Sequence, residues 1–254
     1  MADKNAREKL HQQQAAAAAR KRRGRIVGVG IAVVVVIAAA VTTVLLVQHN
    51  QSVAVNQRPA GTPPDANSEG TGIVVNPGKA DDSAPVVAVY LDYQCPICHQ
   101  LEQSYGPSFE ELADAGAIQL QYRTMTFLDT NLHNDASTRA AIGASCADFA
   151  GVYPAYHDQV FANQPETEGD GYANDLLRET IPSAVGLTGA KLDDFQQCYD
   201  SQATRGFVQG VNDQALGSGV NGTPTIKVNE KVLDLGKLGD PADLAAVIAQ
   251  AAAS

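Results

Sequence analysis

Basic residues are scarce over most of this 254-residue sequence. The first 50 residues hold eight of the 18 lysines and arginines and two of the 28 acidic residues, which leaves ten basic and 26 acidic residues for the rest. A body with this excess of negative charge repels phosphate backbones, so the composition argues against nucleic-acid binding. Apolar residues make up 44% of the chain, which excludes a wholly disordered protein.

One segment lacks charge altogether. Residues 26–47 are 22 consecutive uncharged and mainly apolar residues. As a helix they would extend about 33 Å, which matches a hydrocarbon core of about 30 Å. A cleaved signal peptide is the alternative, but its apolar region is usually about 7–15 residues long and no clear A-x-A site follows Val47. We therefore expect a transmembrane helix that acts as a signal-anchor, and cleavage stays open.

The charges that flank this segment predict its orientation. Five of the basic residues lie directly before it: Arg20, Lys21, Arg22, Arg23 and Arg25. The next basic residue is Arg58, so the positive-inside rule predicts a cytoplasmic basic tail over 1–25 and an extracytoplasmic remainder on a single-pass cell-membrane anchor. Residues 48–69 contain three prolines among polar residues, which is typical of a flexible linker. The folded body is expected to begin near Gly70.

The rest of the sequence alternates between strand and helix patterns. Strand periodicity is present in five segments: 72–75, 85–92, 117–125, 225–228 and 231–235. A helix is predicted from about 95 to 115, with a kink or break at Gly106-Pro107. Only helix-compatible segments fill residues 130–216. The pattern predicts an α/β fold, in which the strands of residues 70–129 and 217–254 close one sheet and residues 130–216 form an inserted all-helical subdomain that lies over it.

Two of the four cysteines lie in the run Cys95-Pro96-Ile97-Cys98, where a buried strand meets a helix. At a helix N-terminus, free N–H groups and the helix dipole favour the thiolate of Cys95 and lower its pKa. Cys98 lies one turn later, so the two sulfurs can bridge. Pro96 suits the first helical turn because its missing N–H has no helical partner to lose. This predicts an exposed nucleophilic sulfur on Cys95 and a shielded resolving sulfur on Cys98.

Three other interpretations of this motif stay open on the residues alone. A structural disulfide needs no strand–helix junction, and a zinc site needs a second close Cys/His pair, which the sequence lacks. The run Cys95–His99 also has the C-x-x-C-H sequence of c-type haem attachment. Its second haem ligand would be His133 or His157, since Met125 falls in a predicted strand.

The remaining cysteines, Cys146 and Cys198, both fall in the helical block, 52 positions apart. Outside the cytosol such a pair is most simply a structural disulfide. Closing this loop stabilises a fold by roughly 4 kcal/mol in the chain-entropy model. A relay pair that exchanges electrons with Cys95–Cys98 is the alternative.

The run VVAVYLDYQCPICHQLE, the helical block and Gly222-Thr223-Pro224-Thr225 before a β-hairpin together resemble the DsbA-like branch of the thioredoxin superfamily. The likeness covers about residues 70–254 and is greatest to membrane-tethered, extracytoplasmic versions in Gram-positive bacteria. It implies a thioredoxin fold, with a mixed central sheet flanked by helices. It also implies a redox-active Cys95–Cys98 disulfide with no further cofactor and no metal. Cys95 would form the mixed disulfide with substrate, and Cys98 would resolve it.

The resemblance also implies a substrate-binding surface around Cys95. Pro224 would be a cis-proline that faces Cys95, and Thr223 would present its backbone to the substrate chain. Pro96 and Ile97 would contact substrate as well. Tyr93 is suited to the same apolar surface.

Two departures from the family pattern concern the redox potential. Ile97 stands where such oxidases often have histidine, and Val89 stands where many relatives have a buried carboxylate. His99 and Asp92 are possible modulators, although Asp92 is expected on the opposite face of the strand. The potential, and with it the direction of electron flow, stays open.

The function implied is a protein disulfide oxidase that introduces disulfides into unfolded or reduced exported proteins. A membrane oxidase, either quinone-linked or vitamin-K-epoxide-reductase-like, would reoxidise it. The alternatives are a thiol reductase or disulfide isomerase on the same fold, the c-type haem protein, and a non-catalytic binding domain.

Overall fold

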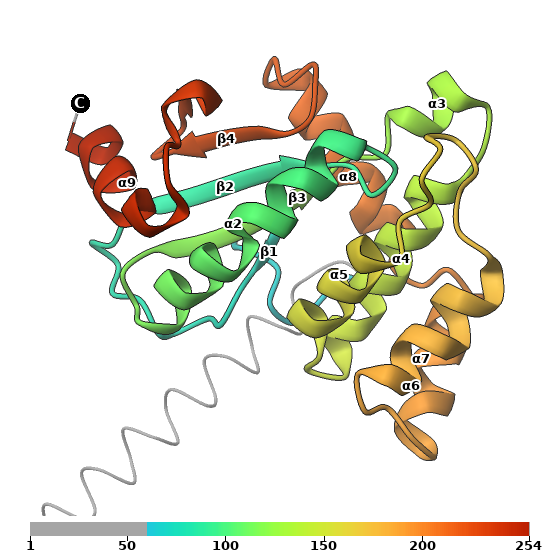
Figure 1. The fold of residues 1–254 in the computed structure, drawn as a ribbon. Coiled ribbons are helices and arrows are strands. Elements are labelled where there is room, and N and C mark those ends of the chain that lie inside the picture. Colours follow the sequence, from blue (N-terminus) through green and yellow to red (C-terminus); the bar gives the residue numbers. More distant parts are fainter. Residues whose placement is uncertain (1–59, 254) are drawn as a thin grey trace, which may run out of the picture. The chain divides into compact units, whose positions relative to one another are not determined.

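The computed structural model describes residues 60–253 (Figure 1). The predicted cytoplasmic tail, the predicted transmembrane helix over 26–47 and residues 48–59 of the predicted linker lie outside the described residues. Among the helices of residues 60–253, none has the length and apolar character needed to cross a bilayer.

A single mixed sheet forms the centre of the described chain. Its strands are β1 (Ile73–Val74), β2 (Val86–Leu91), β3 (Gln119–Thr124), β4 (Thr225–Val228) and β5 (Lys231–Leu233). The strand order is β1-β3-β2-β4-β5, with β2 and β3 parallel and all other neighbours antiparallel. The predicted mixed sheet is therefore confirmed.

The central strand β2 is buried on both faces. Val87, Val89 and Leu91 join the larger apolar cluster, which includes side chains of α2 (Pro96–Asp114) and α9 (Leu244–Ala253). Ala88 and Tyr90 point the other way and pack with Ala215 of α8 (Arg205–Gly217). Figure 1 shows α2 and α9 on one side of the sheet and α8 on the other. Burial on both sides explains why this strand is apolar almost without interruption.

Helices alone fill the chain between β3 and β4, as predicted for the insertion. In order they are α3 (Leu128–Leu132), α4 (Ala136–Phe149), α5 (Tyr153–Ala162), the π-helix η1 (Leu176–Thr180), α6 (Ile181–Ala184), α7 (Ala190–Asp200) and α8. Two short 3-10 helices, η2 (Leu235–Lys237) and η3 (Pro241–Asp243), precede α9. Helices α4 and α5 lie so close that a Cβ on Gly143 would come within 2.2 Å of the Tyr156 hydroxyl oxygen.

Helix α2 continues through the point where a break is predicted. It runs from Pro96 to Asp114 as one element, with Pro107 inside it. Phe109 and Ala113, beyond the proline, are almost wholly buried in the larger core cluster. Packing of this face keeps the second half helical despite the hydrogen bond that proline removes, so the predicted break is absent.

The folded domain begins earlier than Gly70, so the predicted linker boundary at residue 69 is wrong. The backbone N–H of Asp65 donates to Asp148 Oδ2 at 2.9 Å, and the Asn67 side-chain amide donates to Gln121 Oε1 at 2.9 Å. Ala66 is buried and forms a β-bridge with Ile73. The Asn, Asp, Gly and Pro content that suggests a linker is equally suited to tight turns, and here the turns pack on the domain.

Candidate active site

Cys95 lies where the central strand gives way to a helix. It is the N-cap residue of α2, with extended backbone dihedrals (φ −78°, ψ 118°), and Pro96 occupies the first helical turn. Its backbone N–H donates to the carbonyl oxygen of Asp92 at 3.0 Å, which closes the turn after β2. Cys98 follows one turn into the helix, and both cysteines are free thiols. The structure therefore has the dithiol at the predicted strand–helix junction.

The two thiols differ in exposure less than predicted. Cys95 is only 6% exposed and Cys98 is fully buried, whereas Ile97 between them is 54% exposed. The expectation of an exposed Cys95 sulfur is therefore wrong. Its Sγ donates a hydrogen bond to the carbonyl oxygen of Thr223 at 3.4 Å, so the segment before β4 covers it. Cys95 is still the more accessible of the pair.

The electrostatic environment separates the two thiols. The pKa of Cys95 is lowered to about 6, chiefly by a hydrogen bond with the Cys98 side chain. Burial opposes this shift, while Thr223 and the backbone at Cys98 and Ile97 add to it. The pKa of Cys98 is raised well above its ordinary value by burial and by its interaction with Cys95. Cys95 therefore ionises before Cys98, which is the difference that their predicted roles require, and its hydrogen bond to Thr223 belongs to the protonated thiol.

The Thr223–Pro224 segment faces the dithiol from the other side. Its peptide bond is cis, and it directly precedes β4. Strand β4 pairs with β2, which brings this segment beside the end of the strand that leads into Cys95. The predicted role of Thr223 and Pro224 in holding substrate stays a prediction.

The helical insertion holds the loop that precedes Cys95. The carbonyl oxygen of Tyr93 accepts hydrogen bonds from the Tyr172 hydroxyl at 2.6 Å and from Gln164 Nε2 at 2.7 Å. Gln164 Nε2 also donates to the carbonyl oxygen of Cys95 at 3.1 Å. The Gln94 side chain bonds to Asn134 and Ser137 at the start of α4. Sequence reasoning missed these residues because nothing in their local pattern distinguishes them from ordinary polar positions.

Asp92 is fully buried beneath this loop. Burial raises its pKa to about 7, although Ser137 Oγ donates to Asp92 Oδ1 at 2.5 Å and the backbone N–H groups of Gln94 and Leu128 also donate to the carboxyl group. The described hydrogen bonds of the Asp92 carboxyl group are with these groups, whereas the Asp92 backbone hydrogen-bonds to the Cys98 thiol. Modulation of the cysteines by Asp92 stays a prediction.

A buried polar cluster lies between α2 and α5. Tyr93 is fully buried, so the prediction that it adds to an exposed apolar surface is wrong. Its hydroxyl lies 2.8 Å from Nδ1 of His157, which is also fully buried and is therefore enclosed in this cluster. The Tyr122 hydroxyl donates to Glu102 Oε2 at 3.0 Å, and the same oxygen lies 3.6 Å from His157 Nε2. The cluster joins residues of α2, β3, α5 and the loop before α2, which local sequence patterns do not reveal.

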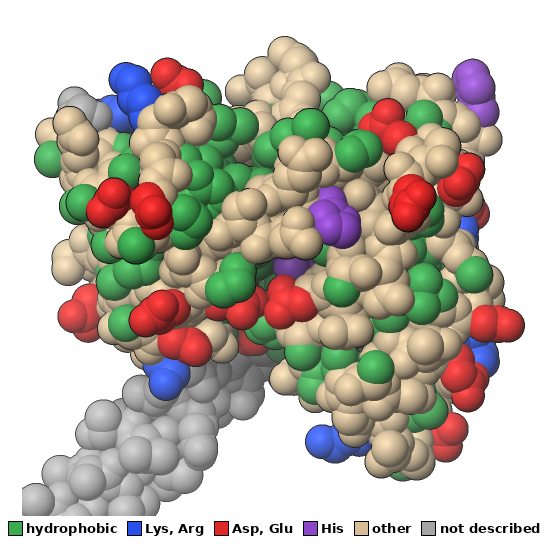
Figure 2. Space-filling model, viewed as in Figure 1, with side chains coloured by type: hydrophobic (Ala, Val, Ile, Leu, Met, Phe, Trp, Pro, Cys, Tyr) green, Lys and Arg blue, Asp and Glu red, His purple; other side chains and the backbone are tan. Residues whose placement is uncertain are grey.

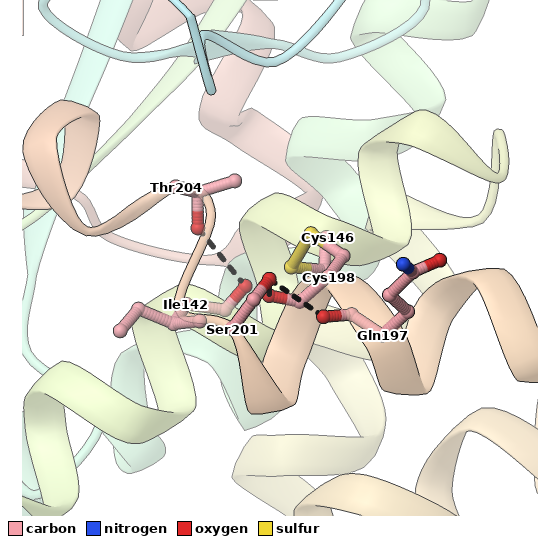
Figure 3. The surroundings of a disulfide bond; sticks show 6 residues. All are labelled: Ile142, Cys146, Gln197, Cys198, Ser201 and Thr204. Atoms are coloured by element: carbon pink, nitrogen blue, oxygen red, sulfur yellow. Dashed lines mark hydrogen bonds between the residues drawn. A yellow bond between two sulfur atoms is a disulfide. The ribbon is translucent and has the colours of Figure 1, made fainter.

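The second cysteine pair forms the predicted structural disulfide (Figure 3). It joins Cys146 of α4 to Cys198 of α7, with the two Cα atoms 5.9 Å apart. Next to it, Thr204 Oγ1 donates to the carbonyl oxygen of Ile142 at 3.4 Å. Together these contacts fix the end of α7 and the start of α8 against α4.

The described residues offer no group of three or more His, Cys, Asp or Glu side chains that could hold a metal ion. His99, one turn into α2, is half-buried and lines a cavity between α2 and α5. Val89 is fully buried within β2.

A dithiol at the start of a helix, next to a cis-prolyl peptide on a mixed sheet, defines the class of thioredoxin-fold thiol–disulfide oxidoreductases. The chain belongs to the thioredoxin family, whose model matches residues 77–249.

Individual relatives narrow the family to its DsbA-like members. Disulfide bond formation protein D of Bacillus subtilis (strain 168) is 25% identical over 173 residues, which are 66% of this chain and 74% of that protein. The reduced structure of DsbA from Mycobacterium tuberculosis is 25% identical, with a TM-score of 0.54 over 71% of this chain and 99% of the other. MdbA from Actinomyces oris shares the fold at 20% identity, with a TM-score of 0.64 over 76% and 93% of the two chains. The chain is a DsbA-like thiol–disulfide oxidoreductase.

Proposed function

We propose that this protein is an extracytoplasmic disulfide oxidase that introduces disulfides into unfolded or reduced exported proteins through Cys95 and Cys98. The observation that carries the proposal is the low pKa of Cys95, about 6, beside a buried Cys98 thiol. A stabilised Cys95 thiolate makes the reduced Cys95–Cys98 pair more stable. The Cys95–Cys98 disulfide is therefore a stronger oxidant.

The proposed reaction starts from the Cys95–Cys98 disulfide. A substrate thiolate attacks Cys95 Sγ, which forms a mixed disulfide and releases the sulfur of Cys98, which takes up a proton. A second substrate thiolate then attacks the substrate sulfur of the mixed disulfide and expels Cys95 as a thiolate. The substrate loses two electrons and the protons of its two thiols. The Cys95–Cys98 pair gains the two electrons. The low pKa of Cys95 makes it the better leaving group in the second step.

The surface around Cys95 supports binding of an extended chain. Thr223 presents its carbonyl oxygen beside the sulfur, and Ile97 offers an exposed apolar side chain next to it. A substrate that pairs with the backbone at Thr223 and Pro224 would lie across Cys95 and replace the contact that now covers its sulfur. Pro96 borders the same surface at the first turn of α2.

The proposal includes the anchor and the orientation expected from the sequence, with residues 26–47 in the cell membrane and residues 48–254 outside. The disulfide between Cys146 and Cys198 supports this location, since such bonds persist in oxidising compartments. Regeneration of the Cys95–Cys98 disulfide would fall to a membrane oxidase of the quinone-linked or vitamin-K-epoxide-reductase-like type.

The direct test measures the Cys95–Cys98 equilibrium with glutathione in the detergent-solubilised full chain, together with refolding of a reduced multi-disulfide protein. The proposal expects a potential above thioredoxin's, about −270 mV, and refolding that Cys95→Ser abolishes. A potential at or below that value would instead assign the chain to the reductases. Unchanged refolding by the Cys95→Ser variant would indicate a non-catalytic domain.

A further inference from the structure

Helix α2 also borders a cavity that takes no part in the thiol–disulfide exchange. This cavity of about 290 Å³ opens between α2 and α5, starting one turn after Cys95. Its lining residues are His99, Glu102, Gln103, Gly106, Pro107, Glu110, Asp158, Phe161 and Ala162. Three of these side chains are carboxylates, one is histidine, and none is lysine or arginine. Figure 2 shows acidic and histidine side chains gathered at the hollow on this face.

Within residues 60–253 no lysine or arginine pairs with the carboxylates of this cavity, and the basic group beside Glu102 is the buried His157, whose Nε2 lies 3.6 Å from Glu102 Oε2. Glu102 is only 7% exposed, and its Oε1 atom is fully buried without a hydrogen-bond partner among the described residues. Glu110 Oε1 is likewise buried and has no hydrogen-bond partner among the described residues. Burial and the nearby charge of Asp158 together raise the pKa of Glu110 to about 7, although the charge of His157 lowers it. An acceptor left unpaired in a buried site costs free energy, so a donor that enters this cavity is favoured.

We infer that this acidic cavity is a subsite for a basic side chain, arginine or lysine, of the polypeptide being oxidised. The inference rests on the proposed function, because it assigns the ligand to the substrate chain. A guanidinium group presents several donors in one plane, which suits carboxylates that approach from α2 and α5. Phe161 adds an aromatic ring to the same wall. The cavity is also far larger than a bare metal ion needs, and its side chains do not form a metal-ligating group.

The position of the cavity predicts where the basic residue lies in the substrate. At about 1.5 Å per residue of helix, Glu102 is about 10 Å and Glu110 about 22 Å along α2 from Cys95. An extended chain covers about 3.3 Å per residue. A basic residue about three to seven positions from the reacting cysteine therefore reaches the carboxylates.

The test uses dithiol peptides that differ at one position. Each peptide has arginine or its neutral isostere citrulline at a set distance of two to eight residues from the first cysteine. The disulfide form of the detergent-solubilised full chain oxidises them, and acid quenching with chromatography gives the second-order rate constant. We expect the arginine peptide to react about fivefold faster at the favoured spacing, and the preference to disappear in Glu110→Gln and Asp158→Asn.

Glu111→Gln is the matched control, since Glu111 is the exposed neighbour of Glu110 on α2 and lies outside the cavity lining. It removes the same charge and is expected to keep the preference. Equal rates for arginine and citrulline peptides in the unmodified chain would overturn the inference, as would an equal loss in Glu111→Gln. Loss of the preference when calcium is added at constant ionic strength would also overturn it, because the cavity would then be a metal site.

A binding measurement separates failure of this inference from failure of the proposed function. Fluorescent versions of the peptides with serine in place of both cysteines report binding without exchange. Tighter binding of the arginine version, together with oxidation of neither dithiol peptide, would support the subsite and contradict the oxidase. Oxidation of both dithiol peptides at the same rate would support the oxidase and contradict the subsite.

Discussion

The sulfur of Cys95 lies 3.4 Å from the carbonyl oxygen of Thr223, although 128 positions separate the two residues in the sequence. Pairing of β4 with β2 brings them together, because Cys95 follows the end of β2 and Thr223 precedes the start of β4. The contact covers the nucleophile in the dithiol form. It also places backbone groups where a substrate chain would lie across the sulfur.

The low pKa of Cys95 is expected to depend mainly on Cys98. The hydrogen bond between the two side chains is the largest cause of the shift, so Cys98→Ala should raise the pKa of Cys95 from about 6 toward its ordinary value of 9.0. Cys98→Ser keeps a donor and should give an intermediate value. Ultraviolet absorbance of the thiolate during a pH titration measures both. An unchanged pKa in Cys98→Ala would mean that the helix N-terminus alone stabilises the thiolate.

The redox potential is expected to lie between those of thioredoxin and DsbA, about −270 and −120 mV, and nearer the first. The reason is that a Cys95 pKa of about 6 falls between the values of about 7 and 3.5 found in those two proteins. Equilibration with glutathione, quenched by an alkylating reagent, gives the potential. A value close to −120 mV would show that groups other than those around the thiolate control the exchange.

The chemistry of the dithiol could be predicted from the sequence because its signals are local. A buried strand, a cysteine at the start of a helix and a second cysteine one turn later all lie within about 15 residues, and their geometry follows from helix and strand periodicity. The single sheet and the helical insertion follow from the same patterns. The Cys146–Cys198 pair could be predicted because the inferred compartment favours disulfides.

The remaining features depend on contacts between distant segments. Nothing near Cys95 in the sequence reveals that Thr223 covers its sulfur, so its burial could not be predicted. Glu102 is a charged residue for which an exposed position would be expected, and the packing of α2 against both β3 and α5 makes it buried. Residues 60–69 have the composition of a linker, but hydrogen bonds to Asp148 and Gln121 fix them to the domain.

Removal of the Cys146–Cys198 disulfide is expected to lower stability without changing the exchange chemistry. The bond closes a loop with a sequence separation of 52, so the double variant Cys146→Ala/Cys198→Ala should lose at most about 4 kcal/mol of unfolding free energy. Denaturant unfolding of the full chain measures this loss. The Cys95–Cys98 potential serves as the control and should not change. A large change in potential would indicate that the pair exchanges electrons with the active dithiol.

Asp92 is expected to make stability depend on pH between about 4 and 7. Its pKa rises from 3.8 to about 7 on folding because the carboxyl group is buried, so the folded state favours the protonated form. Its contribution to stability is therefore complete below pH 3.8 and is lost as the pH rises to about 7. The loss is at most about 4 kcal/mol, because each pKa unit corresponds to about 1.4 kcal/mol.

Asp92→Asn should accordingly flatten the fall in unfolding free energy over this range, since the amide does not ionise. Denaturant unfolding at a series of pH values measures the slope. Glu110, whose pKa is also raised to about 7, contributes a slope of the same sign, so the variant reduces the fall and does not abolish it. Ser137→Ala provides the opposite change, because it removes a hydrogen bond that lowers the pKa of Asp92 and should extend the fall to higher pH. If Asp92→Asn leaves the slope intact, the Asp92 carboxylate is ionised at low cost in the folded protein, and burial does not control it.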